Sequence, residues 1–216
     1  MRIVFHGAAN GSPEQDERNL LRRQVQKSGL KYVPVKGNPS YARISYGPSI
    51  GREICTEREY ADLYFWQPVS AAVLRERLSD AQAGLEVLEA YRVPYNFASI
   101  QNLASAAAYR VEGDFSAYTP AVPAEIYFNA PQLKITRQAD NGMSFTFEAK
   151  PFIYRVQQIG PQGMRLVLQC VAEKWISPQE LMAAWLGVEE PQLSTTFQFI
   201  REGLFWKDTN GTFYPL

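Results

Sequence analysis

The chain has 216 residues, of which 46% are hydrophobic and 20% are charged, and its basic and acidic side chains balance at 22 each. This composition supplies apolar surface for folded cores and lacks the strongly basic character of a dedicated nucleic-acid binder. The length suits two domains of roughly 100 residues each. Residues 1–60 hold ten basic and six acidic side chains, so this part is mildly basic. Charge alone favours a solvated face over a phosphate-facing or docking surface.

The sequence predicts a cytoplasmic protein without a membrane segment. No apolar run approaches the roughly 18 residues that a membrane-spanning helix needs. The opening Met-Arg-Ile-Val-Phe-His is typical of a strand and not of a signal peptide. Cys55 and Cys170 lie far apart in the sequence without a paired spacing, so we expect reduced thiols.

Residues 1–93 predict a first module with the order β-α-β-β-α-β. A strand over Arg2–His6 precedes a helix that begins with the capping-box signature Ser12-Pro-Glu-Gln15 and ends at Ser28-Gly29. The next predicted elements are two strands, a helix and a strand over Ala42–Tyr46, Tyr60–Trp66, Val69–Leu78 and Leu85–Val93. This order predicts a ferredoxin-like domain.

Residues 94–105 are predicted to form a linker, and residues 106–216 a second, strand-rich module. Two hairpin turns are indicated by Asp140-Asn-Gly142 and Gly160-Pro-Gln-Gly163. A further helix is predicted from a capping box at Ser177 to Gly187. The other predicted elements are a strand, a helix, four strands and a last strand over Ala107–Glu112, Pro123–Ala130, Leu133–Arg137, Met143–Glu148, Phe152–Gln158, Met164–Val171 and Thr195–Ile200. The sequence therefore predicts an α+β protein of two tandem ferredoxin-like modules, the second carrying an extra β-hairpin.

The residues do not predict a catalytic or metal centre. A single histidine, His6, excludes a metal site built from several histidines. The turn Gly7-Ala-Ala-Asn-Gly11 lacks the lysine and the spacing of a phosphate-binding P-loop. We therefore expect no catalytic residues, no metal and no cofactor, and a protein that is not itself an enzyme.

The predicted first helix carries basic side chains away from its leucines. Arg18 and Arg22 are four residues apart, as are Arg23 and Lys27. Together with Arg43 and Arg52 they could form one positive surface that contacts RNA phosphates. The alternative is that they pair with nearby carboxylates, namely those of Glu14, Glu17, Glu57 and Glu59.

The aromatic side chains can be interpreted either as part of a binding surface or as part of a core. Tyr41 and Tyr46 could stack on bases, although alternating aromatic residues in a strand are more often part of a core. The tryptophans are interpreted as packing anchors, and any of them that is exposed, particularly Trp206 beside a C-terminal turn, would be a candidate interface residue. The tryptophans are Trp66, Trp175, Trp185 and Trp206.

Residues 20–92 resemble the radical SAM-linked protein family, a domain of unknown function found fused to, or encoded beside, radical SAM enzymes. The resemblance rests on the following segments, which match the family pattern: Leu20-Leu21-Arg22-Arg23, Lys27-Ser28-Gly29-Leu30, Gly37, Arg43-Ile44-Ser45-Tyr46-Gly47-Pro48, Glu59-Tyr60-Ala61-Asp62 and Leu85-Glu86-Val87-Leu88. Beyond residue 105 only the element order is similar. The chain departs from the family's Gly-Phe-x-Pro-x-Pro run, where it has Asn38, Ser40 and Ala42.

The resemblance implies a bacterial-type accessory protein that works with a separate radical SAM enzyme. Such an enzyme holds its iron–sulfur cluster with three closely spaced cysteines, which this chain lacks. We expect the chain to position an RNA, such as a tRNA or rRNA, or a protein substrate for that partner. The residues expected to form the binding surface are Arg22, Arg23, Arg43, Ser45, Tyr46 and Arg52.

Two alternatives remain open on the sequence. One is a metal-independent RNA-processing nuclease on the same tandem fold, whose acid–base chemistry would rest on His6, Tyr41 or Ser45. The other is a purely structural partner subunit, in which the acidic second half and its aromatic residues form a protein interface. The substrate, the oligomeric state and the effect of the altered Gly37–Ala42 segment stay undetermined.

Overall fold

The computed structural model describes residues 1–6, 14–51, 53–94, 96–138, 142–171 and 174–216. These residues form two units, Met1–Ala104 and Ser105–Leu216. The boundary falls between residues 104 and 105, so all but the last residue of the predicted linker, residues 94–105, belongs to the first unit. Ile100 in this segment is fully buried. Among the described helices, none is long and apolar enough to cross a membrane.

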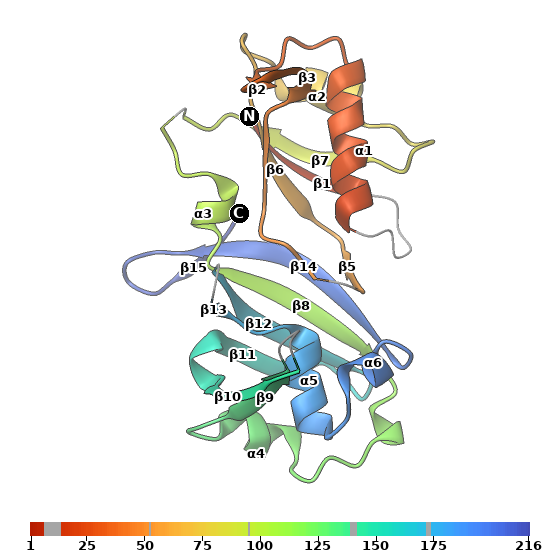
Figure 1. Cartoon of the computed structure of the whole chain (residues 1–216), viewed down its shortest axis with the longest axis vertical. Helices are drawn as coiled ribbons and strands as arrows, with labels where there is room; N and C mark the ends of the chain where they lie inside the picture. Colours follow the sequence, from red (N-terminus) through yellow and green to blue (C-terminus); the bar gives the residue numbers. More distant parts are fainter. Residues whose placement is uncertain (7–13, 52, 95, 139–141, 172–173) are drawn as a thin grey trace. The chain divides into compact units, whose positions relative to one another are not determined.

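The first unit is a mixed α+β structure (Figure 1). Its helices are α1, α2 and α3, over Glu14–Lys27, Ala71–Leu78 and Ile100–Leu103. Its strands β1 to β7 cover Arg2–His6, Pro34–Val35, Asn38–Ala42, Ile44–Tyr46, Ile54–Thr56, Glu59–Leu63 and Glu86–Tyr91. Four of these strands form an antiparallel sheet in the order β4-β6-β1-β7, and β2 pairs with β3 in a hairpin.

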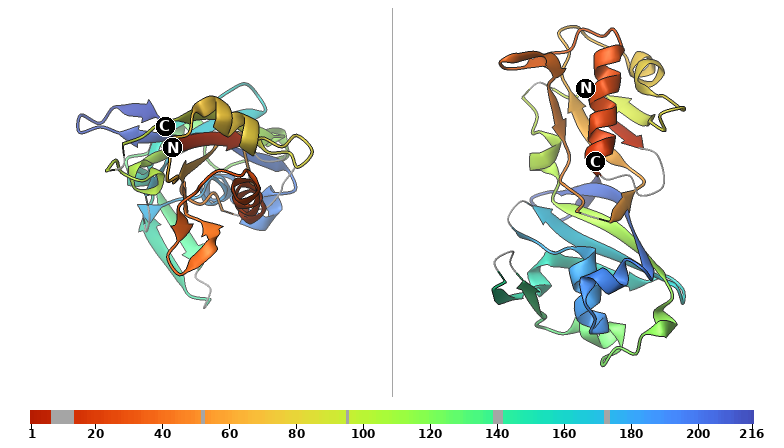
Figure 2. Two further views of the ribbon diagram at one scale, coloured as in Figure 1. Left: turned by 90° about the horizontal axis from the view of Figure 1, so that it is seen from above. Right: turned by 45° about the vertical axis from the view of Figure 1, so that its right-hand side comes forward.

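One face of this sheet packs against α1 and α2, which lie side by side (Figure 2). Ile3 and Phe5 alternate along β1 toward the helices and meet Leu21 of α1 and Leu74 of α2, and all four side chains are fully buried. Alternate residues of a strand point to opposite faces. Arg2 therefore points to the other face, where α3 contacts β4 and β6.

The sequence correctly placed the C-terminal ends of α1 and α2 and missed parts of the loops. Gly29 has φ +73°, the left-handed conformation predicted at the end of α1. The predicted capping box at Ser12 lies outside the described residues. Helix α2 begins two residues later than predicted, because the Ser70 hydroxyl accepts the backbone N–H of Val73 and caps it. The hairpin β2–β3 and the short strand β5 were not predicted.

The second unit contains a longer antiparallel sheet. Its strands β8 to β15 cover Ala106–Gly113, Lys134–Gln138, Ser144–Glu148, Ile153–Gln158, Gly163–Val171, Lys174–Trp175, Phe197–Lys207 and Phe213–Pro215. Its helices α4, α5 and α6 cover Ala124–Asn129, Pro178–Leu186 and Glu190–Leu193. The sheet order is β11-β12-β8-β14-β15, and β13 pairs with β12. The two short 3₁₀ turns cover Phe115–Ala117 and Lys150–Phe152.

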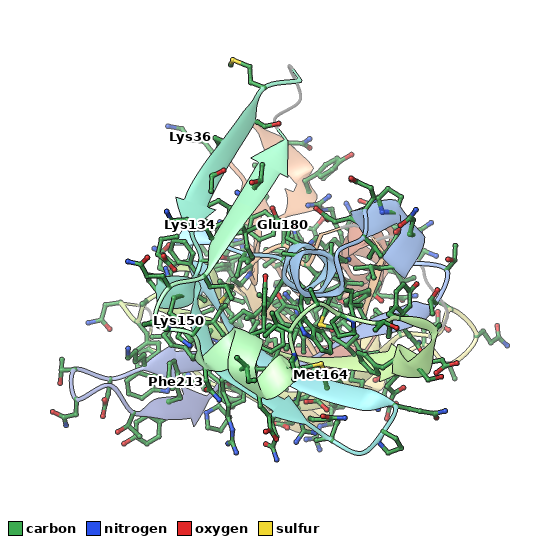
Figure 3. All side chains as sticks on the ribbon, turned by 90° about the horizontal axis from the view of Figure 1, so that it is seen from below. Lys36, Lys134, Lys150, Met164, Glu180 and Phe213 are labelled. Carbon is green, nitrogen blue, oxygen red and sulfur yellow. The ribbon has the colours of Figure 1, made fainter. Side chains whose placement is uncertain are left out.

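Both predicted hairpins of this unit are present. β9 pairs with β10, and Figure 3 shows this hairpin projecting from the rest of the unit. Gly142, after the undescribed residues 139–141, has φ +80°. β11 pairs with β12 across the turn that contains Gly160, whose φ is +76°. The sequence therefore identified both turns from their glycines.

The helix predicted from Ser177 is also confirmed, with its capping box. The Ser177 hydroxyl accepts the backbone N–H of Glu180 at 2.9 Å, and the Glu180 carboxylate accepts the backbone N–H of Ser177 at 3.0 Å. Gly187 ends the helix with φ +71°. The last predicted strand, Thr195–Ile200, is wrong at both ends, because β14 begins at Phe197 and continues to Lys207 beside β8 and β15.

Candidate functional site

Helix α1 and the adjoining strands of the first unit place arginine side chains on tyrosine rings. The guanidinium carbon of Arg18 lies 4.9 Å from the ring centre of Tyr46, and that of Arg22 lies 5.6 Å from the ring centre of Tyr41. One helical turn separates the two arginines, so both point from the same side of α1. Cation–π contacts of this kind hold the guanidinium groups in place without using their charge in an ion pair.

Two further hydrogen bonds join Arg18 to Tyr46 and to the neighbouring Gly47. The Tyr46 hydroxyl donates to the backbone oxygen of Arg18 at 2.8 Å, and Arg18 Nη2 donates to the backbone oxygen of Gly47 at 3.0 Å. Burial raises the pKa of Tyr46 to about 12, although Arg22 and Arg18 act in the opposite direction. The hydroxyl therefore stays protonated at neutral pH and keeps its hydrogen bond.

A third arginine, Arg43, lies between β3 and β4 and stacks on Tyr64, with 4.5 Å between the guanidinium carbon and the ring centre. Its backbone N–H donates to the backbone oxygen of Val33 at 2.8 Å. Arg23, on the outer side of α1, and Arg43 are exposed, and Arg22 is half-buried. Within the part of the chain that the structure describes, none of these three arginines takes part in an ion pair.

Among the described residues, none of the carboxylates considered as alternative partners forms an ion pair with Arg22, Arg23 or Arg43. Glu17 and Glu59 are buried, with 7% and 1% of their surface exposed. Glu57 is exposed, and no described ion pair joins it to Arg22, Arg23 or Arg43. The side chain of Glu14 lies outside the described residues. No carboxylate of the described residues therefore neutralises Arg22, Arg23 or Arg43.

The predicted site residues do not all meet on one surface. Ser45 pairs with Asp62 of β6 and, by strand alternation, points to the face opposite Tyr46. Ser45 therefore shares the face on which α3 lies, and Tyr46 shares the face of α1. Arg52 lies outside the described residues. The structure brings Arg22 and Tyr46 together at α1, with Arg43 at the strand end.

Two neighbouring hollows lie beside Arg43 and were missed by the sequence analysis. The first, of about 550 Å³, is lined in part by Asp62, Tyr64, Trp66, Arg92 and Phe97. The second, of about 480 Å³, is lined in part by Pro34, Lys36, Pro39, Arg43 and Trp66. Trp66 and Val33 line both hollows, which we call the Trp66 hollows. The residues that line the two hollows come from distant parts of the sequence of the first unit, so no local motif predicts the hollows.

The tryptophan predictions are partly wrong. Trp66 is 69% exposed and is not a packing anchor. Trp206 is half-buried and stacks on Tyr214 with 5.0 Å between ring centres, so it packs as predicted for the tryptophans. Trp175 is 46% exposed and holds Arg137 against its ring. Trp66 is therefore an exposed tryptophan in the same unit as the predicted arginines.

The residues considered for a nuclease centre lie on different strands, with His6 and Ser45 in the four-stranded sheet and Tyr41 in the β2–β3 hairpin. Ser45 of β4 pairs with Asp62 of β6, and Asp62 pairs with Arg2 of β1. His6 lies four residues farther along β1 than Arg2, so it is two strands away from Ser45 and four residues along the sheet. With about 3.3 Å per residue and about 4.8 Å between strands, His6 and Ser45 lie on the order of 16 Å apart. Tyr41 lies on β3 against Arg22. Among the described residues, no group of His, Cys, Asp and Glu side chains could hold a metal ion.

Comparison with known proteins identifies a family that the chain matches. The model of a family described as "Uncharacterized protein conserved in bacteria (DUF2344)" matches residues 14–180. The matched region contains α1, the arginine–tyrosine contacts and Trp66. No curated protein matches the chain.

Proposed function

The chain belongs to the DUF2344 family of uncharacterized proteins conserved in bacteria, and we propose that it is an accessory protein that binds RNA. The observation that carries this proposal is the set of arginine–tyrosine contacts, in which Arg22 and Arg43 lie on tyrosine rings with no described carboxylate partner. Single-stranded RNA is recognised by aromatic rings and guanidinium planes that stack on bases, together with salt-sensitive phosphate contacts.

The topology supports a second part of the proposal, namely that each unit is a ferredoxin-like module. In the first unit the strands β1, β4, β6 and β7 follow the order strand-helix-strand-strand-helix-strand, and the first strand pairs with the third and the fourth. In the second unit the strands β8, β11, β12 and β14 have the same order and pairing. The hairpin β9–β10 is then an insertion after α4.

The partner in this proposal is a separate radical SAM enzyme. The proposal rests on the resemblance of residues 20–92 to the radical SAM-linked family and on the cysteine content, because Cys55 and Cys170 cannot supply three cluster ligands. In this role the chain binds the RNA while the partner carries the cluster and performs the chemistry.

A protein interface of the second unit is the second candidate, and the β9–β10 hairpin favours it. Met143 and Phe145 are 65% and 48% exposed and lie two residues apart, on the same side of the strand. Exposed apolar side chains on one side of a projecting hairpin are typical of a protein contact. A complex that forms through this hairpin would be insensitive to salt and would need no RNA.

The test is an affinity capture from lysate of a bacterium that encodes the chain, with and without ribonuclease, followed by identification of bound proteins and RNA. We expect RNA in the untreated sample and a radical SAM enzyme in both. The same capture with Arg22, Arg23 and Arg43 replaced by glutamate should lose the RNA. Unchanged RNA in the folded triple variant would contradict RNA binding at this site, and absence of a radical SAM enzyme would contradict the partnership.

A further inference from the structure

We propose that the Trp66 hollows bind an unpaired nucleotide of single-stranded RNA, with its base on the Trp66 indole and its phosphate held by the cations that line the hollows. This inference deepens the proposed function, on which it rests, because it states which form of RNA is recognised. It follows from three features of the site: an exposed aromatic ring on a hydrogen-bonded backbone, cations without a carboxylate partner among the described residues, and neutralisation of the carboxylate that lines the first hollow.

The Trp66 ring is exposed although its backbone is firmly held. The backbone N–H of Trp66 donates to the backbone oxygen of Lys31 at 2.9 Å. The adjoining residues are held in the same way, since Val33 N–H donates to the oxygen of Tyr64 at 2.8 Å and Tyr32 forms a bridge with Phe65. An aromatic ring that is 69% exposed on a rigid backbone is a ready platform for stacking.

The lining of the hollows is cationic where a phosphate would lie. Lys36 and Arg43 line the second hollow and Arg92 lines the first. All three are exposed, and within the described residues none of them forms an ion pair. Because Arg43 is held on the Tyr64 ring, its outer N–H groups are positioned to donate to a phosphate oxygen.

The single carboxylate that lines the first hollow is already neutralised. Asp62 accepts two hydrogen bonds from Arg2, at 2.8 and 3.0 Å, and one from the backbone N–H of Ile100 at 2.9 Å. Asp62 therefore does not repel a phosphate, and charge complementarity favours an anionic aromatic ligand over a neutral proline-rich peptide. Bases of a duplex are stacked on each other, so only an unpaired nucleotide offers its face to Trp66.

The test compares two fluorescent RNA probes of the same length and charge per strand, a single-stranded oligonucleotide without secondary structure and a blunt duplex. Binding is measured for the full chain and for Trp66→Ala, Trp66→Phe and the control Phe145→Ala, which removes an exposed aromatic ring from the second unit. Circular dichroism and thermal unfolding confirm that each variant folds.

We expect the unmodified chain to prefer the single strand and Trp66→Ala to weaken that binding by about tenfold, as stacking of one base predicts. Trp66→Phe should keep much of the affinity for the single strand. The Trp66 variants should bind the duplex as the unmodified chain does, and Phe145→Ala should bind the single strand with unchanged affinity. Single-strand binding that is unchanged in Trp66→Ala overturns this inference while the RNA-binding function stands. If the unmodified chain binds neither probe, both this inference and the proposed RNA-binding function are overturned. If the chain then binds a proline-rich peptide and Trp66→Ala loses that binding, the hollows bind a protein ligand.

Discussion

Arg2 and Asp62 form a bidentate ion pair inside the first unit, with 2.8 Å between Arg2 Nε and Asp62 Oδ1 and 3.0 Å between Arg2 Nη2 and Asp62 Oδ2. Arg2 also donates to the backbone oxygen of Ala98 at 3.1 Å, and Asp62 accepts the backbone N–H of Ile100. The pair therefore joins β1 and β6 to the segment that leads into α3, and Asp62 also lines the first of the Trp66 hollows.

We predict that Asp62→Ala lowers the free energy of unfolding by about 3–5 kcal/mol, because it leaves a buried guanidinium without its partner. The side chains of Arg2 and Asp62 are only 2% and 6% exposed. Urea unfolding at neutral pH measures the change. The double variant Arg2→Met/Asp62→Leu should recover most of the loss, since both charges are then removed. A loss of less than about 1 kcal/mol in Asp62→Ala, the range of exposed pairs, would contradict a structural role for the pair.

The basic side chains of α1 and of the β3–β4 junction should make RNA binding sensitive to salt. We predict that Arg23→Glu/Arg43→Glu weakens binding to single-stranded RNA and reduces the slope of log K against log salt by about 0.7 for each phosphate that the variant no longer binds. The control is Arg75→Glu/Arg155→Glu, which changes the net charge equally at two other exposed arginines. Equal effects of the two double variants would indicate a general charge effect in place of a local site.

Alkaline pH should destabilise the chain through Tyr46. Burial raises the pKa of Tyr46 to about 12 in the folded state, whereas it is near 10 in the unfolded chain. The unfolded state therefore loses its proton first, and the stabilisation is complete below pH 10 and declines as the pH rises toward 12. We expect Tyr46→Phe to be less stable at neutral pH, without the hydrogen bond to Arg18, and to lose less stability between pH 10 and 12. Parallel pH profiles in urea unfolding would disprove this assignment.

Cys170 should be unreactive in the folded protein. Burial raises the pKa of its thiol to about 12, with Arg201 acting in the opposite direction. At pH 8 roughly one thiol in ten thousand is then ionised, and the thiolate is the reactive form. In the Cys55→Ser variant we expect negligible alkylation by iodoacetamide until the protein is unfolded. Rapid labelling of the native variant would show that the thiol is accessible and ionised.

The capping box of α5 gives a test of local stability. Ser177→Ala removes a hydroxyl that accepts the backbone N–H of Glu180 and should lower the free energy of unfolding by about 1 kcal/mol. Ser70→Ala, at the start of α2, is the control, because it removes a capping hydroxyl that is exposed, whereas the Ser177 cap is buried. We expect a smaller loss there, because water can replace the Ser70 hydroxyl but not the buried Ser177 hydroxyl. Equal losses in thermal unfolding would mean that burial does not strengthen the Ser177 cap.

The sequence by itself determined the elements whose signals are local. The capping box at Ser177, the end of α1 at Gly29 and the two hairpins of the second unit all depend on residues within a few positions of one another. A capped helix or a glycine turn has its free energy minimum within that short segment, so its pattern can be read without knowing the rest of the chain. The α+β class followed from the order of these elements.

Only the tertiary structure decided which side chains share a surface. Ser45 and Tyr46 are adjacent in the sequence, yet strand alternation separates them to opposite faces. Trp66 is 69% exposed, although its backbone pairs with Lys31. The Trp66 hollows combine residues from distant positions of the first unit, which come together only through sheet pairing and the Arg2–Asp62 ion pair. Contacts between distant segments depend on the free energy of the whole unit, and no short pattern encodes them.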